Sequence, residues 1–303
     1  MKHISKITAI ALLATLSACE GSDMPIQQAD NHGYISFSAQ PQKTATRANP
    51  YEAYDPTRHP ATMGTFGYYD MPKRYASAAN TIFNNETATY NVATYGWDTA
   101  TKKRWTEYTK ASSFDFFAYM PYTGGATLLR TANNTYTLSF PFAMSDGGNP
   151  VPVIYDTKAA PIICAVPSSK GAISDSNGGG TVSLKFDQTL TGYKLLFMLG
   201  TKMNAIRHFR IKSVTLSGSF STSCTISRSY VWNTTSKSWS ASAITWSDIK
   251  RQSFVETPFP IAYKGYGSAD YDDNTQTVIV TSAGYTQWGA DIYTCLLYTS
   301  DAA

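Results

Sequence analysis

Short apolar runs and positions that alternate between apolar and polar recur along the chain, and this pattern predicts β-strands. The alternation is clearest at residues 33–39, 136–142 and 182–187. Residues 114–122 form the most apolar window after the N-terminal leader, which predicts a central strand that ends at Pro121. No amphipathic helix longer than two turns is apparent. The sequence therefore predicts an all-β fold.

Two pairs of tryptophans predict β-hairpins. Trp97 and Trp105 flank the basic turn 102–104, and Trp232 and Trp239 flank a second polar segment. Polar turns between aromatic strand residues are typical of hairpins, because aromatic side chains pair well across neighbouring strands.

The length of the chain predicts more than one domain. Its 303 residues exceed the span of about 100–200 residues that is typical of one domain. Residues 168–180 are rich in Ser and Gly and can bury little, so they indicate a border. We expect two β-sandwiches in series, one at residues 33–170 and a truncated one at 171–294. Residues 295–303 break the strand pattern, and we interpret them as a non-native tail.

The N-terminus has the charge pattern of a secretory signal. Lys2, His3 and Lys6 precede the apolar run 7–16, which is too short to span a bilayer. The run leads into Leu-Ser-Ala-Cys, which resembles a bacterial lipobox, so the thiol of Cys19 is the predicted acceptor of diacylglycerol. We expect a signal peptide at 1–18 and a polar tether at 19–32. A cleaved, unlipidated signal with an incidental cysteine is the alternative.

The first predicted strand consists of Tyr34, Ile35, Ser36, Phe37 and Ser38, with Ile35 and Phe37 on one face. A polar stretch follows it and ends in a lone basic residue, Arg47, just before Ala48. From the residues alone, an ordinary exposed arginine in a loop is the favoured interpretation of Arg47, and a plausible protease cutting point is the alternative.

Composition and charge limit which partners and which kind of fold we expect. Charged residues make up 15% of the chain, and Tyr, Ser and Thr are abundant, which favours strands with hydroxyl-rich outer faces. The net charge of +4 is spread thinly without a basic run, so nucleic acid is not an expected partner. Cys164, Cys224 and Cys295 lie at irregular spacing, and both a disulfide and buried free thiols stay open.

Candidate chemistry is sparse. The motifs of metalloproteases, serine hydrolases and P-loop enzymes are absent from the sequence, so we expect no enzyme, no cofactor and no metal. Asp270, Asp272, Asp273 and Asn274 resemble the start of a calcium loop, but the glycine and glutamate that such a loop needs are missing, which favours a solvated turn.

The aromatic residues allow two interpretations. Tyr68, Tyr69, Trp97 and Trp105 could form a platform on which sugar rings stack, or they could belong to the sandwich core, which we favour. Residues 98–100 resemble a bacterial O-glycosylation tripeptide, which is short enough to occur by chance.

An ordered set of motifs follows the lipobox. In chain order the motifs are I-S-F-S-A at 35–39, T-R at 46–47, G-T-F-G-Y-Y-D at 64–70, F-F-A-Y-M-P at 116–121, V-I-Y-D at 153–156, V-S-L-K-F-D-Q-T-L at 182–190 and I-K-S-V-T-L-S-G at 211–218. This set resembles the fimbrillin family, the type V pilins and pilus-like lipoproteins of anaerobic Gram-negative commensals. The resemblance covers roughly residues 33–280 and implies two tandem transthyretin-like β-sandwich domains.

The resemblance also implies a mechanism. Such precursors reach the outer membrane as surface-exposed lipoproteins, here anchored through Cys19. An arginine- or lysine-specific, trypsin-like protease then cuts after the first strand, here between Arg47 and Ala48. Another pilin subunit supplies an extended segment in its place, so the subunits polymerise into a fimbria that can contact a host surface protein or glycan. We expect the strand that is lost to lie at the edge of its sheet.

A second hypothesis comes from a different class. The chain could be a surface glycan-binding lipoprotein that stays anchored and monomeric and gains nothing from losing its first strand. Cleavage at Arg47 separates the two hypotheses.

Overall fold

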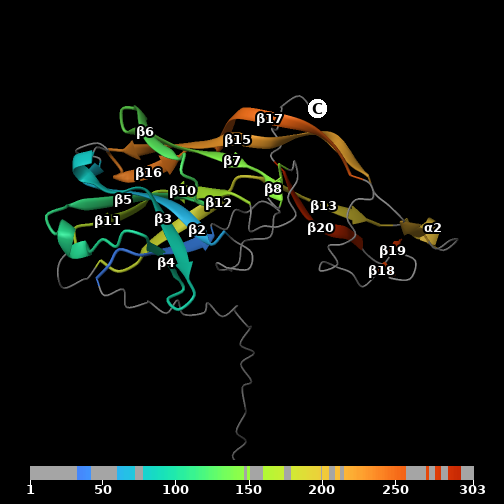
Figure 1. The fold of residues 1–303 in the computed structure, drawn as a ribbon, viewed down its shortest axis with the longest axis horizontal. Helices are drawn as coiled ribbons and strands as arrows, with labels where there is room; N and C mark the ends of the chain where they lie inside the picture. Colours follow the sequence, from blue (N-terminus) through green and yellow to red (C-terminus); the bar gives the residue numbers. More distant parts are fainter. Residues whose placement is uncertain are drawn as a thin grey trace, which may run out of the picture.

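A computed structural model describes residues 33–41, 60–71, 78–146, 149–150, 160–173, 179–198, 200–204, 209–211, 215–256, 271–272, 277–280 and 286–294. These residues form an all-β protein with a sandwich-like arrangement of sheets (Figure 1), as predicted. Helical segments in this part of the chain are short: η1 (Ala78–Asn80), η2 (Trp105–Tyr108) and α2 (Thr201–Asn204).

The first sheet has eight strands in the order β10-β12-β1-β4-β3-β2-β5-β11. Their bounds are β1 (Phe37–Pro41), β2 (Thr62–Tyr69), β3 (Thr81–Asn91), β4 (Gly96–Thr99), β5 (Ser113–Met120), β10 (Ile162–Val166), β11 (Ser168–Gly171) and β12 (Val182–Gln188). Strand β10 pairs with β12 on one side and with β5 on the other. The sheet therefore curls until it closes on itself.

The second sheet covers one side of the first (Figure 1). Four strands run in the order β16-β15-β7-β6, and β17 pairs with β15. Their bounds are β6 (Thr127–Ala132), β7 (Thr135–Ala143), β15 (Leu216–Asn233), β16 (Ser238–Ala241) and β17 (Thr245–Glu256). Serine and threonine hydroxyls pair across its outer face, for example Thr137 with Ser229 and Ser139 with Ser227, both at 2.8 Å.

Residues 114–122 are so apolar because both faces of strand β5, which contains most of them, are buried. Phe116 points into the curled sheet, where its ring meets Phe37. Phe117 and Tyr119 point to the second sheet, where Tyr119 stacks on Phe140 with ring centroids 4.5 Å apart. The protein therefore has one core inside the curled sheet and another between the two sheets.

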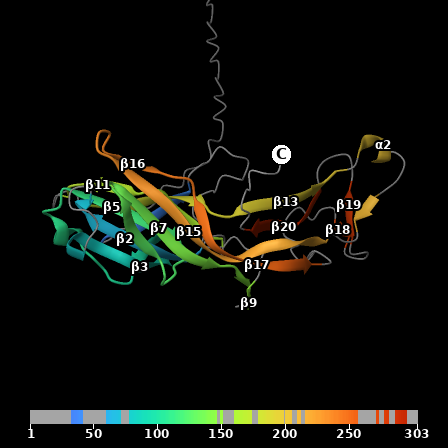
Figure 2. The same ribbon diagram turned by 90° about the horizontal axis from the view of Figure 1, so that it is seen from above.

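The long strand β15 continues from the second sheet into the C-terminal part of the chain (Figure 2). Residues 216–227 of this strand pair with β17 and residues 223–231 pair with β7, so its middle has partners on both sides. The remaining strands form small sheets: β13 (Thr191–Phe197) with β20 (Thr286–Thr294), β14 (Phe209–Ile211) with β19 (Thr277–Val280) and β18 (Tyr271–Asp272), and β8 (Ser145–Asp146) with β9 (Asn149–Pro150).

Both main sheets contain strands from each side of the predicted border at 170/171. Strand β12 lies in the first sheet, and β15 pairs with β7 from Ser223 to Val231. The border therefore does not separate the sheets. The glycines that suggested a linker include Gly179, which is buried against a tryptophan, as described below.

One of the two predicted hairpins forms. Trp232 and Trp239 pair across β15 and β16, with ring centroids 5.2 Å apart. The hairpin predicted between Trp97 and Trp105 is wrong, because β4 pairs with β3 through a turn at 92–95. The basic residues 102–104 lie instead beside the first strand.

Candidate functional site

The candidate site is the place of the first strand in the curled sheet. Pairing runs from Phe37 to Pro41, and Tyr34 adds an isolated bridge to Arg104. The prediction that this strand lies at a sheet edge is wrong, because β1 lies between β12, to which it is parallel, and β4, to which it is antiparallel. We call residues 33–41 the β1 segment. The β1 groove is the space that this segment fills between β12 on one side and β4 with residues 103–105 on the other.

Apolar side chains fix the β1 segment to the core of the curled sheet. Phe37 is fully buried, and Ile35 is 2% exposed. The Phe37 ring meets Phe83 and Phe116 edge to face, with centroids 5.9 Å and 5.6 Å away. Burying a side chain of this kind stabilises a fold by about 1.5–3 kcal/mol. The two side chains together therefore contribute about 3–6 kcal/mol to holding the segment in place.

Backbone hydrogen bonds hold the N-terminal end of the segment. The Ile35 N–H donates to the Lys103 carbonyl at 2.8 Å, and the Trp105 N–H donates to the Gly33 carbonyl at 3.0 Å. These bonds extend the sheet on the β4 side beyond the strand itself. Each contributes about 0.5–1.5 kcal/mol in net terms.

The opposite edge of the segment faces β12. The Val182 N–H donates to the Ser36 carbonyl at 2.8 Å, and five residue pairs follow in parallel register from Phe37 with Val182 to Pro41 with Phe186. Ser36 is 4% exposed, and its Oγ lies 3.4 Å from Thr181 Oγ1. The small side chain of Ser36 is therefore buried against the start of β12.

A cationic clamp, formed by Lys102 and Arg104, surrounds the ring of Tyr34. Lys102 Nζ lies 5.5 Å from the ring centroid, and Arg104 Cζ lies 4.8 Å from it. Arg104 Nη2 also donates to the Tyr34 hydroxyl at 2.9 Å. Cations over an aromatic face are attracted by its quadrupole, by about 0.5–1 kcal/mol at exposed sites.

Trp105 closes the groove beside the clamp. Its indole N–H donates to the Gly180 carbonyl at 3.0 Å, and its ring meets Phe116 edge to face. Gly179 lies against the ring with φ +65°, and a Cβ there would come within 2.4 Å of it. Lys170 lies over the same ring and donates to the Gly179 carbonyl, and burial lowers the pKa of its ammonium.

A buried carboxyl, Asp115, joins the two sheets behind the groove. Its Oδ1 accepts hydrogen bonds from Ser169 Oγ and from the indole N–H of Trp239. Burial raises the pKa of Asp115, and these two hydrogen bonds oppose the rise in part. No cation pairs with this carboxyl in the described part of the chain, and its other oxygen has no hydrogen-bond partner there.

A second polar cluster also spans the sheets. Tyr230 donates to the Cys164 carbonyl at 2.7 Å and accepts from the Cys164 thiol at 2.9 Å. Arg228 forms an ion pair with Asp187 at 2.6 Å. Burial raises the pKa of the Cys164 thiol to about 11, so the reactive thiolate is disfavoured. Cys164 and Cys224 are both buried free thiols, which settles the alternatives for this pair.

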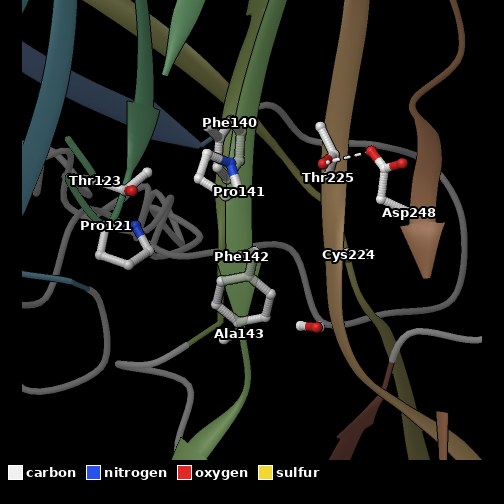
Figure 3. A pocket seen from close by; sticks show the side chains of 10 residues that line it. Pro121, Thr123, Phe140, Pro141, Phe142, Ala143, Cys224, Thr225 and Asp248 are labelled. Carbon is white, nitrogen blue, oxygen red and sulfur yellow. Dashed lines mark hydrogen bonds between the residues drawn. The ribbon is translucent and has the colours of Figure 1, made fainter. Parts of the chain in front are cut away.

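A pocket with a volume of about 460 Å³ lies where β7, β15 and β17 meet the turn after β5 (Figure 3). Pro121, Pro141 and Phe142 form apolar walls. Asp248 stands at the rim with φ +52° and accepts from Thr225 Oγ1 at 3.0 Å. The pocket offers one carboxylate and neighbouring hydroxyls, without a histidine or lysine among its lining residues to activate a nucleophile.

The predicted site residues divide into two groups. Tyr34, Ile35, Ser36, Phe37 and Ser38 lie together in the β1 groove. Cys19, Arg47, Ala48 and the calcium-like residues Asp270, Asp273 and Asn274 lie outside the described residues. Within the described part of the chain, no group of three or more His, Cys, Asp and Glu side chains could hold a metal ion.

The sugar platform does not form as hypothesised, because Trp97 and Trp105 are each 1% exposed and Tyr68 is 5% exposed. Thr99, the acceptor in the glycosylation-like tripeptide, is buried and donates to the Thr101 carbonyl. Sequence reasoning missed the clamp residues Lys102 and Arg104. Their position between two tryptophans indicated a turn and nothing more.

No family model matches the chain, and no curated protein is significantly similar to it. No helix among the described residues is long and apolar enough to cross a membrane.

Proposed function

We propose that the chain is the lipoprotein precursor of a fimbrial subunit, structural or adhesive, that polymerises by strand exchange after proteolytic loss of its first strand. In this proposal Cys19 carries the lipid that anchors the precursor to the outer membrane. Cleavage between Arg47 and Ala48 frees the β1 segment, and a segment of another subunit replaces it. The chain has no catalytic role, and each transthyretin-like sandwich serves as a building block.

The observation that carries the proposal is the position of β1. It is an interior strand with a buried aromatic side chain, yet it belongs to the first part of the fold and connects onward through the stretch that contains Arg47. A single cut in that stretch would leave the segment attached only by non-covalent contacts. Removing it would uncover a row of backbone groups on β12, the backbone groups of Trp97, Lys103 and Trp105 on the other side, and the rings of Phe83 and Phe116.

Physical chemistry makes such a vacancy unstable. Unpaired backbone groups and bare aromatic side chains between two strands favour the binding of any extended segment that restores both ladders. A contact in which one subunit fills the groove of the next is head-to-tail and does not close on itself, so repetition produces a filament. The glycan-binding alternative has less support, because the aromatic side chains hypothesised as its platform are mostly buried.

The test is controlled cleavage at Arg47. An arginine-specific protease should produce a new N-terminus that reads Ala48, Asn49, Pro50, Tyr51 by mass spectrometry. Size-exclusion chromatography with light scattering should then show oligomers as the β1 segment leaves, and the Arg47→Ala chain should stay monomeric. A monomer whose melting temperature is unchanged after loss of the β1 segment would contradict the proposal.

A further inference from the structure

We propose that the β1 groove selects the strand that replaces β1 through two subsites. The cationic clamp of Lys102 and Arg104 takes an aromatic side chain. The space that Phe37 fills beside the rings of Phe83 and Phe116 is the second subsite, and it takes a second aromatic side chain three residues later. The partner is therefore an extended segment with the order aromatic, aliphatic, small, aromatic. This inference rests on the proposed exchange of β1.

The first subsite is defined by charge. Lys102, Lys103 and Arg104 place three cations in a row, and two of them lie against the Tyr34 ring. These cations stay on the body of the protein when the β1 segment leaves. The two cations attract an incoming aromatic ring, and the guanidinium of Arg104 can also donate a hydrogen bond to a hydroxyl on it. An incoming lysine or arginine is repelled by the same charges. The clamp therefore accepts an aromatic residue and rejects a basic one.

The second subsite is defined by shape. Phe37 is 0% exposed, and the rings of Phe83 and Phe116 meet it edge to face. A smaller side chain would leave a void beside these rings, because close-packed interiors relax only in part. The second subsite therefore favours a phenyl-sized ring over an alanine-sized side chain.

The spacing between the subsites fixes the register. Ile35 is 2% exposed on the core side, and Ser36 faces Thr181 across a gap of 3.4 Å between their hydroxyl oxygens. A slip of one residue would place the intermediate small residue in the core and the ring against Thr181. The cationic clamp and the second subsite beside Phe83 and Phe116 together therefore accept a strand in one register.

The experiment measures exchange of labelled peptides into the cut protein. The recombinant chain carries a recognition sequence for a specific protease between Arg47 and Ala48, and after cleavage it is incubated with fluorescent peptides of residues 33–41. Competition measured by fluorescence polarisation ranks the peptides. Phe37→Ala should weaken binding by roughly a hundred-fold or more, and Tyr34→Ala by roughly five- to thirty-fold. Tyr34→Lys should bind more weakly than Tyr34→Ala, and Ser38→Ala should bind like the parent peptide.

A double-mutant cycle tests the clamp itself. Arg104→Gln in the protein should weaken the parent peptide by roughly two- to fivefold, yet leave the Tyr34→Leu peptide unaffected. Lys110→Gln removes one positive charge at an exposed position outside the clamp and serves as the matched control. Equal losses for both peptides, or equal binding of the Tyr34→Lys and parent peptides, would overturn the inference.

The outcomes also separate this inference from the proposed function. If no peptide exchanges after cleavage, the β1 segment does not leave, and the proposed function itself is refuted. If all peptides with alternating apolar residues exchange equally, strand exchange stands and the selective subsites are refuted.

Discussion

Replacing Phe37 by alanine is the most direct test of how β1 is held. The substitution removes a fully buried ring from between Phe83 and Phe116 and leaves their edges without a partner. Phe→Ala in a core typically lowers the free energy of unfolding by about 3–5 kcal/mol. The upper part of that range applies here, because Phe37 itself pairs with Val182 on β12 and with Trp97 on β4, so the backbone at this position cannot shift inward without breaking a pairing.

A loss of about 4 kcal/mol is large against the total of about 5–15 kcal/mol that is typical of a folded domain. Phe37→Leu retains most of the apolar volume and should lose about 1–2 kcal/mol. Ser38→Ala, at a half-buried neighbouring position, should change the free energy of unfolding by less than about 0.5 kcal/mol and is the matched control.

Urea titration followed by tryptophan fluorescence measures these differences. Trp97 and Trp105 border the β1 groove, so their emission reports on the sheet that contains it. The slope against denaturant should be the same for all variants, because the surface exposed on unfolding is unchanged. A loss below about 1 kcal/mol for Phe37→Ala would show that the ring is not tightly packed, and the account of a strand anchored by this side chain would be wrong.

Further predictions concern positions outside β1. Burial raises the pKa of Asp115, so the fold loses stability as the pH rises from the ordinary carboxyl pKa to the raised one, and the full cost of the charged form is present above it. Asp115→Asn, which keeps an acceptor for Trp239, should therefore raise the melting temperature at pH 7, with the gain shrinking towards pH 4. Gly179→Ala should destabilise the protein by at least about 1 kcal/mol in urea, because φ is positive and the new Cβ would overlap the Trp105 indole. A thiol reagent should leave Cys164 unmodified until denaturant is added, since its side chain is fully buried and its pKa is raised to about 11.

Local pattern was enough to predict many of the strands. Alternation at 136–142 and 182–187 corresponds to β7 and β12, where one face is buried and the other is more exposed. The apolar window at 114–122 corresponds to β5, whose continuous apolar character reflects burial of both faces. The sequence predicts the first strand at residues 34–38, whereas pairing in the structure extends from Phe37 to Pro41.

The arrangement of the strands could not be predicted in the same way. The parallel pairing of β1 with β12 joins residues about 145 positions apart, and nothing in the local pattern of either strand names its partner. The glycines at 179–180 look like a flexible linker in the sequence. In the structure the absence of a side chain at Gly179 lets the backbone approach Trp105, so the same composition serves close packing.

In the candidate site, too, some features follow from the local sequence pattern and others depend on long-range contacts. Burial of Ile35 and Phe37 follows from alternation, but the role of Lys102 and Arg104 depends on a bridge between Tyr34 and Arg104. Such a long-range contact leaves no periodic trace in either segment.

Strand β15 has a mechanical consequence. Its 18 residues run from the small sheets of the C-terminal part into the layer that covers the curled sheet. Ladder hydrogen bonds lie perpendicular to the strands they join, so tension along β15 loads its bonds to β7 in shear, and nine residue pairs share the load. Tension along β15 is therefore resisted by these bonds acting together, and they do not break one at a time.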